Sequence, residues 1–269
     1  MSTTEIRRDG IGFDVQSNLQ YAGFWARFVG NTWEPNTLRI LREYLKPDET
    51  MLDIGAWIGP TTLYGAQFAK NVVAIEPDPV AYRELTGNLA LNPDIQARVE
   101  VVNVCLAPTN SPVPIYSGGF HHSDESSFGD SMTSLLPSQT ADGQSQVNAQ
   151  GITIADLDSE YDLSSLGFVK MDIEGGEYVL LTTMGEFFNT YQPTLYISFH
   201  VPPKAYRDER ITETFQFLSD TFTTIYSATG KLLPLKEVLA MNPDWSRMEV
   251  DSPSTMLMTV AREGLIAIF

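Results

Sequence analysis

The chain has 269 residues, 43% of them hydrophobic, which is enough apolar material for one large or two small globular domains. Asp and Glu number 34 against 17 Lys and Arg, giving a formal net charge of −17 at pH 7. Because such a surface repels a phosphate backbone, we expect no nucleic-acid partner.

Three further classes of protein are disfavoured by composition. No stretch reaches the roughly 18 consecutive apolar residues of a spanning helix, so we expect no membrane span. The first residues lack the basic start and apolar core of a secretory signal, so a cytoplasmic location is expected. A single cysteine, Cys105, excludes an internal disulfide framework and any Cys-rich zinc module.

Residues 1–47 are predicted to form an N-terminal extension followed by a helix. The first 30 residues carry several aromatic side chains, which indicates a segment that docks on the rest of the chain. After Pro35, Leu38, Leu41 and Leu45 recur at helical spacing, which predicts a helix that ends near residue 46.

From residue 48 onward, short β-branched segments alternate with helical ones, a pattern typical of βαβ units and a parallel sheet. We therefore predict one α/β domain over residues 48–269 with a doubly wound, mostly parallel sheet. The expected strands are 50–55, 71–75, 98–104, 167–173, 194–199, 223–226 and 255–261, and the expected helices are 60–70, 79–92, 176–191 and 211–222.

Residues 108–150 interrupt this alternation. They are rich in Ser, Gly, Pro and Gln, with one short candidate strand at 113–116. A polar loop of this length inside a domain is usually functional, so we interpret it as a lid or substrate loop.

The sharpest motif is Met51-Leu-Asp-Ile-Gly-Ala-Trp-Ile-Gly59, which follows a predicted strand and opens a predicted helix. Gly55 and Gly59 permit positive φ angles and close backbone approach, so a ligand can lie against this turn. The dinucleotide fingerprint G-x-G-x-x-G would require glycine at Trp57, so the turn does not fit a pyrophosphate.

Two carboxylates refine the prediction of the ligand. Asp53, at the end of the first parallel strand, favours a cationic or amino-acid ligand over a phosphate. Glu76 ends the second strand about 20 residues past the glycines, where a carboxylate accepts hydrogen bonds from a ribose diol. Together they predict S-adenosylmethionine (SAM), and a nicotinamide cofactor is the alternative because it shares the second carboxylate.

Lys170, Asp172 and Glu174 alternate along a strand that is expected to be buried. An unpaired ion there loses several kcal/mol on desolvation, so each must pair, meet water or meet a ligand. Lys170 and Asp172 are near neighbours on one face, so a structural ion pair is one explanation for both. Asp172 and Glu174 lie nearer the carboxyl end of the strand, where open α/β sheets bind ligands, and are our first candidates for the reaction site.

His200 ends the next predicted strand. If that strand lies beside the previous one, His200 and Asp172 converge, and a histidine with an ordinary pKa near 6.5 could accept a proton from an alcohol. The same pair could hold a divalent metal ion, and a histidine with a purely structural hydrogen bond is the alternative.

Several blocks of the chain together resemble the FkbM family of SAM-dependent methyltransferases, over residues 33 to about 200. Lys-x-Asp-x-Glu-Gly-x-Glu at 170–177 is the most specific of them, whereas the glycine turn is shared by most class I methyltransferases. The blocks are Trp33-Glu34-Pro35, LDIGAWIG (52–59), AIEPDP (74–79), 88–92, VVNVCLA (101–107), TIADL (153–157) and VKMDIEGGE (169–177). The chain departs from the family at Trp57, where Asn is usual, and at Ser198-Phe199-His200, where the strand often ends with Glu.

The resemblance implies a Rossmann-like class I fold and O-methylation of a hydroxyl on a sugar, glycoside or secondary metabolite. The acceptor is expected to be a small molecule or glycan, and the sequence leaves the oligomeric state open. A SAM-binding subunit without catalysis and a nicotinamide-dependent oxidoreductase are the alternatives. We expect SAM at Asp53, Gly55, Trp57, Gly59, Glu76, Pro77, Cys105, Leu106 and Asp172, catalysis at His200, Asp172 and Glu174, and any metal ion at Asp172 and His200.

Overall fold

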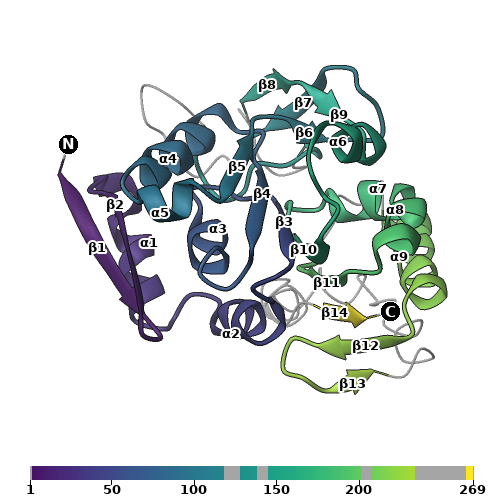
Figure 1. The fold of residues 1–269 in the computed structure, drawn as a ribbon. Coiled ribbons are helices and arrows are strands. Elements are labelled where there is room, and N and C mark those ends of the chain that lie inside the picture. The colour runs from purple at the N-terminus through teal and green to yellow at the C-terminus, as the bar shows by residue number, and fades with distance from the viewer. Residues whose placement is uncertain (1, 118–127, 138–144, 201–206, 234–264, 269) are drawn as a thin grey trace, which may run out of the picture.

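The computed structural model describes residues 2–117, 128–137, 145–200, 207–233 and 265–268. At its centre is an eight-stranded sheet with the order β13-β12-β14-β11-β10-β3-β4-β5 (Figure 1). The five strands from β11 to β5 are parallel, and β14 runs antiparallel to both of its neighbours. The strands are β3 (Thr50–Ile54), β4 (Asn71–Ile75), β5 (Val99–Val102), β10 (Leu166–Met171), β11 (Thr194–Ile197), β12 (Thr224–Ser227), β13 (Leu232–Leu233) and β14 (Leu265–Ile268).

Helices cover both faces of this sheet, which confirms the predicted doubly wound, mostly parallel architecture (Figure 1). Successive side chains of a strand point to opposite faces. Accordingly, Met51 and Phe168 pack with the helices of one layer, while Leu52 and Val169 pack with those of the other. The first layer holds α2 (Pro35–Tyr44), α3 (Pro60–Gly65), α4 (Pro79–Ala90) and α5 (Pro93–Gln96), and the second holds α6 (Ile154–Glu160), α7 (Glu177–Leu180), α8 (Gly185–Tyr191) and α9 (Arg207–Thr221).

The N-terminal segment contains a β-hairpin that its sequence did not lead us to expect. Strands β1 (Thr3–Arg8) and β2 (Ile11–Gln16) pair antiparallel and lead into α1 (Leu19–Val29). Asn88 and Asn92 of the α4 region accept the backbone N–H groups of Gln16 and Asp14, each at 2.8 Å, and so fix β2 against α4. The aromatic side chains of this segment are buried in the first helical layer, as Phe13, Tyr21, Phe24, Trp25 and Phe28 show.

Two predicted helices differ from the structure. Residues 176–191 form α7, a 3-10 helix over Leu181–Thr183 and α8 rather than one helix. Thr183 donates its hydroxyl to the Leu180 carbonyl at 2.7 Å, a local bond that competes with helix continuation, and Gly185 follows. The helix predicted for 60–70 ends at Gly65.

Part of the predicted 108–150 loop has regular structure. The strand expected at 113–116 is confirmed as β7 (Val113–Tyr116), which pairs antiparallel with β8 (Gln146–Ala149). Just outside the hairpin, β6 (Cys105–Leu106) pairs parallel with β9 (Gly151–Ile152). The strand predicted at 255–261 lies outside the described residues, and the last described strand, β14, lies between β12 and β11. Among the described helices, none has the length and apolar character needed to cross a bilayer.

Candidate functional site

Two adjoining cavities open at the carboxyl ends of the central parallel strands. Cavity A has an empty volume of about 590 Å³, part of it open to solvent, and runs from Glu76 at the end of β4 to Asp172 and Glu174 after β10. Cavity B has an empty volume of about 510 Å³, also partly open to solvent, and is lined by Trp33 and His200, among others. Asp172 and Glu174 line both cavities, so the two meet at these carboxylates.

The glycine turn after β3 has the backbone conformation that its sequence predicts. Gly55 and Gly59 have φ angles of +82° and +94°, in the left-handed region that favours glycine. A Cβ at Gly55 would lie 2.0 Å from the carbonyl oxygen of Asp172, and one at Gly59 would lie 2.4 Å from Leu85 Cδ1. The glycines therefore let the turn approach β10 and α4 closely. Gly55 lines both cavities, whereas Gly59 packs beneath the turn on α4.

Trp57 connects this turn to the end of β4. Its backbone N–H donates to Glu76 Oε2 at 2.7 Å, and the N–H of Asp78 donates to Glu76 Oε1 at 2.8 Å. Burial, with a further contribution from Asp78, raises the pKa of Glu76 to about 8. Glu76 and Trp57 both line cavity A, so a carboxyl group with two fixed oxygens faces any ligand there.

Asp53 lies elsewhere than we expected. Its side chain is 0% exposed, with Oδ2 accepting hydrogen bonds from Thr61 and Thr62 at 2.8 and 2.7 Å. Oδ1 lies 3.2 Å from Nζ of Lys170, because β3 and β10 are adjacent and residues 53 and 170 are paired in register. A carboxylate with no exposed surface cannot contact a ligand. Lys170 therefore forms a structural ion pair, but with Asp53 on the adjacent strand and not with Asp172, its neighbour in sequence, and its Nζ also donates to the Gly55 carbonyl at 2.7 Å.

Pro77, Cys105 and Leu106 form an apolar wall of cavity A near Glu76. Burial raises the pKa of the Cys105 thiol to about 12, with Glu76 adding to the effect. The thiol is therefore neutral and packs as a small apolar group.

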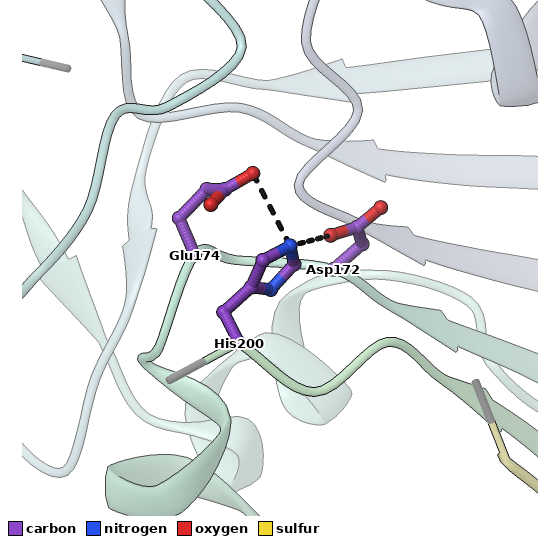
Figure 2. Close-up of side chains that lie close together, drawn as sticks. All are labelled: Asp172, Glu174 and His200. Atoms are coloured by element: carbon purple, nitrogen blue, oxygen red, sulfur yellow. Dashed lines mark ion pairs between the residues drawn. The ribbon is translucent and has the colours of Figure 1, made fainter. Parts of the chain in front are cut away.

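The structure brings Asp172, Glu174 and His200 together (Figure 2). Because β11 lies beside β10, the segment after β11 carries His200 to the carboxylates that follow β10. The Nε2 atom of His200 lies 3.6 Å from Asp172 Oδ1 and 3.4 Å from Glu174 Oε1. These atoms all lie within 4.8 Å of one another, which is close enough for one proton or one cation to be shared.

The pKa of His200 differs from the value that we assumed from the sequence. Burial lowers it, but Glu174, Glu177 and Asp172 together raise the pKa well above its ordinary value. Burial and Asp172 also raise the pKa of Glu174, against the effect of His200. The cluster therefore retains a proton at neutral pH, which disfavours His200 as the neutral proton acceptor and leaves that role to a carboxylate.

Sequence reasoning missed Glu177 as a part of this site. Its side chain is fully buried, and Oε1 lies 3.3 Å from His200 Nδ1. The two oxygens also accept the backbone N–H groups of Ile173 and Gly175, both at 2.8 Å. Glu177 thus orients the imidazole so that Nε2 faces Asp172 and Glu174. The last position of the Lys-x-Asp-x-Glu-Gly-x-Glu block was the available signal.

Glu34 was also missed, although it stands in the Trp33-Glu34-Pro35 block. It lines cavity B from the start of α2, with a φ of +36° that is unusual for a residue other than glycine. Thr37 Oγ1 donates to Glu34 Oε2 at 2.9 Å. Burial and the nearby Asp172 raise the pKa of Glu34 to about 7.

The match to a family model covers most of the chain. The model is described as the methyltransferase FkbM domain, and it matches residues 53–246. No curated protein matches the chain.

Three of the similar solved structures are methyltransferases or carry SAM. A methyltransferase FkbM from Methylobacillus flagellatus KT is 21% identical with a TM-score of 0.39, and the match covers 57% of this chain but only 33% of that one. Precorrin-6y C5,15-methyltransferase from Geobacter metallireducens GS-15 is 15% identical over 72% of each chain, with a TM-score of 0.40. TYW2 from M. jannaschii in complex with AdoMet is 13% identical over 84% of this chain and 78% of that one, with a TM-score of 0.43. On the extent of the family match, this chain belongs to the FkbM methyltransferase family.

Proposed function

We propose that the protein transfers the methyl group of SAM to a hydroxyl group of a small molecule or glycan. The observation that carries this proposal is the meeting of two cavities at Asp172 and Glu174, with His200 beside them. One cavity can hold the methyl donor and the other the acceptor, so the transferred carbon would lie next to groups that can take up a proton.

The residues of cavity A suit SAM. Glu76 can accept hydrogen bonds from the ribose hydroxyls, and Pro77, Cys105 and Leu106 provide an apolar surface for adenine. Bound SAM supplies an electrophilic methyl group on a positively charged sulfur, and the carboxylates of Asp172 and Glu174 favour that charge at their end of the cavity. A pyrophosphate would meet the same carboxylates without a free basic side chain among the described lining residues.

For this reaction the protein has to position the acceptor oxygen beside the methyl group and to remove the hydroxyl proton. As the acceptor oxygen forms its bond to the methyl carbon, the carbon–sulfur bond breaks and its electron pair stays on sulfur. The hydroxyl proton passes to Asp172, whose charge is balanced by His200. Holding the two reactants in line can supply about 7 to 11 kcal/mol of the barrier, so the shape of the two cavities matters most.

The same cluster could instead bind a divalent cation. Asp172, Glu174 and His200 offer two carboxylate oxygens and Nε2, while Glu177 holds Nδ1 from behind, as carboxylates do for metal-bound histidines. A cation there would replace the proton that the cluster otherwise retains and would acidify the acceptor hydroxyl.

The acceptor that we propose is neutral, such as a sugar or glycoside. Cavity B presents the rings of Trp33 and Trp57 together with Glu34, Asp172 and Glu174. Aromatic faces pack against the C–H surfaces of a sugar ring, and carboxylates accept hydrogen bonds from its hydroxyls. The same carboxylates repel phosphorylated or carboxylated acceptors.

The test is mass spectrometry of a panel of glycosides and hydroxylated metabolites incubated with SAM, with and without EDTA. We expect a product 14 Da heavier that is absent with Asp172→Asn, and a rate that EDTA lowers and Mn²⁺ restores if the cation is used. Full activity in EDTA would refute the metal proposal alone. Competition between S-adenosylhomocysteine and NADH for the site distinguishes a SAM site from the nicotinamide site of the alternative. Binding of SAM without methyl transfer to any acceptor would favour the alternative of a non-catalytic SAM-binding subunit.

A further inference from the structure

We propose that Phe128–Leu136, called here the roof segment, is part of the SAM site, and that Tyr21 of α1 and Trp57 hold it in position. The inference rests on the proposed function, because it concerns how cavity A binds SAM. It makes the N-terminal helix a determinant of affinity for the methyl donor.

The roof segment forms one wall of cavity A. Asp130, Ser131, Thr133, Ser134 and Leu135 line the cavity opposite the ends of the parallel strands. Ser131 also lines cavity B, so the wall extends to the place where the cavities meet. Without this segment, cavity A would lack this wall among the described residues.

The roof segment is fixed at Gly129 by three hydrogen bonds. The Gly129 carbonyl accepts the hydroxyl of Tyr21 and the indole N–H of Trp57, both at 3.0 Å. The Gly129 N–H donates to Asp78 Oδ2 at 2.6 Å. The backbone of Gly129, on both sides of its Cα, is therefore held from α1, from the glycine turn and from the start of α4.

Glycine is required at this position. Gly129 has a φ of +90°, and a Cβ there would lie 2.6 Å from Val80 Cγ1 and 2.8 Å from the Tyr21 hydroxyl. The close approach that excludes a side chain is the same approach that makes the hydrogen bond to Tyr21 possible.

Two more bonds carry the roof segment across the cavity. Thr133 Oγ1 donates to Asp78 Oδ2 at 2.9 Å, on the side of β4. Ser134 Oγ donates to the Glu174 carbonyl at 2.6 Å, on the side of β10. The roof thus connects the part of the cavity beside Glu76 with the part beside the reaction site.

The N-terminal helix supports this arrangement through ring contacts. The ring of Trp57 lies 5.8 Å from that of Tyr21 and 4.6 Å from that of Phe24, both edge-on. Trp57 also donates its backbone N–H to Glu76. A change at Tyr21 therefore reaches cavity A both through Gly129 and through Trp57.

The experiment compares two tyrosines that each donate one hydrogen bond between the N-terminal segment and the rest of the domain. Tyr21→Phe removes the bond to Gly129, and Tyr64→Phe removes a bond of 3.0 Å to Asp9 of the hairpin turn. Calorimetric titration of full-length protein with S-adenosylhomocysteine at 25 °C measures folded-state affinity, and thermal melts confirm that both variants are folded.

We expect Tyr21→Phe to raise the Kd for S-adenosylhomocysteine about 3- to 10-fold, the scale of one lost hydrogen bond, with Tyr64→Phe within about 2-fold of the parent. Thr133→Val, which breaks the bond to Asp78, should raise the Kd similarly. If the parent binds but Tyr21→Phe and Thr133→Val bind equally well, the roof proposal is overturned while the proposed function stands. If the parent does not bind at all, both are overturned.

Discussion

Lys170 is a buried charge whose structural role the sequence suggested but whose partner it did not identify. It lies on a central strand beside Asp53, and the two side chains are 3% and 0% exposed. Adjacent strands in register place them opposite each other, and Gly55 takes a further bond from the ammonium group. The sequence could identify the charged strand, but the strand register that pairs residues 53 and 170 is a tertiary property.

Removing one partner of this pair should be costly. Lys170→Met leaves Asp53 buried without its counter-charge, and we expect a loss of about 3 to 5 kcal/mol in the free energy of unfolding. Urea denaturation measures it, and the Lys170→Met/Asp53→Asn double variant should recover part of the loss because no net charge remains buried. A single variant as stable as the parent would contradict the ion pair.

Glu34 should make the stability of the protein depend on pH. Its pKa is raised to about 7 when folded, from an ordinary value of 4.5, so the folded state prefers the protonated form. Its contribution is therefore fully present below pH 4.5 and is lost as the pH rises through 7. Glu34→Gln keeps an acceptor for Thr37 and should lose less in melting temperature between pH 5 and pH 8.5 than the parent does.

The matched control for Glu34→Gln is Glu43→Gln, which lies on the same helix and pairs with Arg39 at the surface. Its melting temperature should follow the parent across the same pH range. If Glu34→Gln and Glu43→Gln give parallel curves, Glu34 does not titrate as described.

Asp172 and His200 should affect turnover more than binding. Asp172→Asn removes a carboxylate that can accept the acceptor's proton, and His200→Ala removes the group that balances its charge. We expect each to lower kcat by about 10² to 10⁴ while changing the Kd for S-adenosylhomocysteine little. Glu76→Ala is the opposite case, with a raised Kd. If either Asp172→Asn or His200→Ala has a kcat within a few-fold of the parent, that residue does not have the role assigned to it.

At the scale of elements, β2 depends on two asparagines of the α4 region. Asn92 Oδ1 accepts the Asp14 N–H, and its Nδ2 donates to the Asp14 carbonyl at 2.7 Å. Asn92→Ala leaves both groups of Asp14 without these partners, so we expect a loss of about 1 to 3 kcal/mol in denaturant unfolding. The control is Asn110→Ala, in the loop between β6 and β7, which should leave the hairpin β1–β2 protected from hydrogen exchange. Unchanged protection of β1 and β2 in Asn92→Ala would contradict this anchoring.

The elements divide into those that local pattern could predict and those that it could not. The parallel strands and α2 and α4 follow from periodicity and Pro at the first helical turn. The hairpin β1–β2 had a local signal that we did not use, since Asp9-Gly10, both with positive φ, forms the two-residue turn between the paired Arg8 and Ile11. Its packing against α4, far along the chain, could not be predicted from local pattern. The break between α7 and α8 lies around Thr183 and Gly185, and the spacing of the apolar residues does not reveal it.

The candidate site divides in the same way. Convergence of Asp172 and His200 followed from the rule that parallel strands end at one edge, once β10 and β11 were taken as neighbours. Glu177 and Glu34 needed the fold, because a turn of the chain brings the first behind His200 and α2 brings the second across cavity B. Their influence on the pKa of the cluster could not be read from spacing alone.

For the whole molecule, one sheet edge gathers groups from three distant parts of the chain. The N-terminal segment supplies Glu34, the turns after β3 and β4 supply Trp57 and Glu76, and the segments after β10 and β11 supply Asp172 and His200. The carboxyl ends of the parallel strands are the place where a doubly wound sheet binds its ligands. We propose that SAM occupies cavity A at this edge, with its methyl group directed at cavity B.

A crystal structure of the protein with bound S-adenosylhomocysteine tests this claim most directly. We predict the ribose hydroxyls within hydrogen-bond distance of Glu76, adenine against Cys105 and Leu106, and the sulfur facing Asp172 and Glu174. A ligand bound outside cavity A, or one whose sulfur points away from cavity B, would contradict the account.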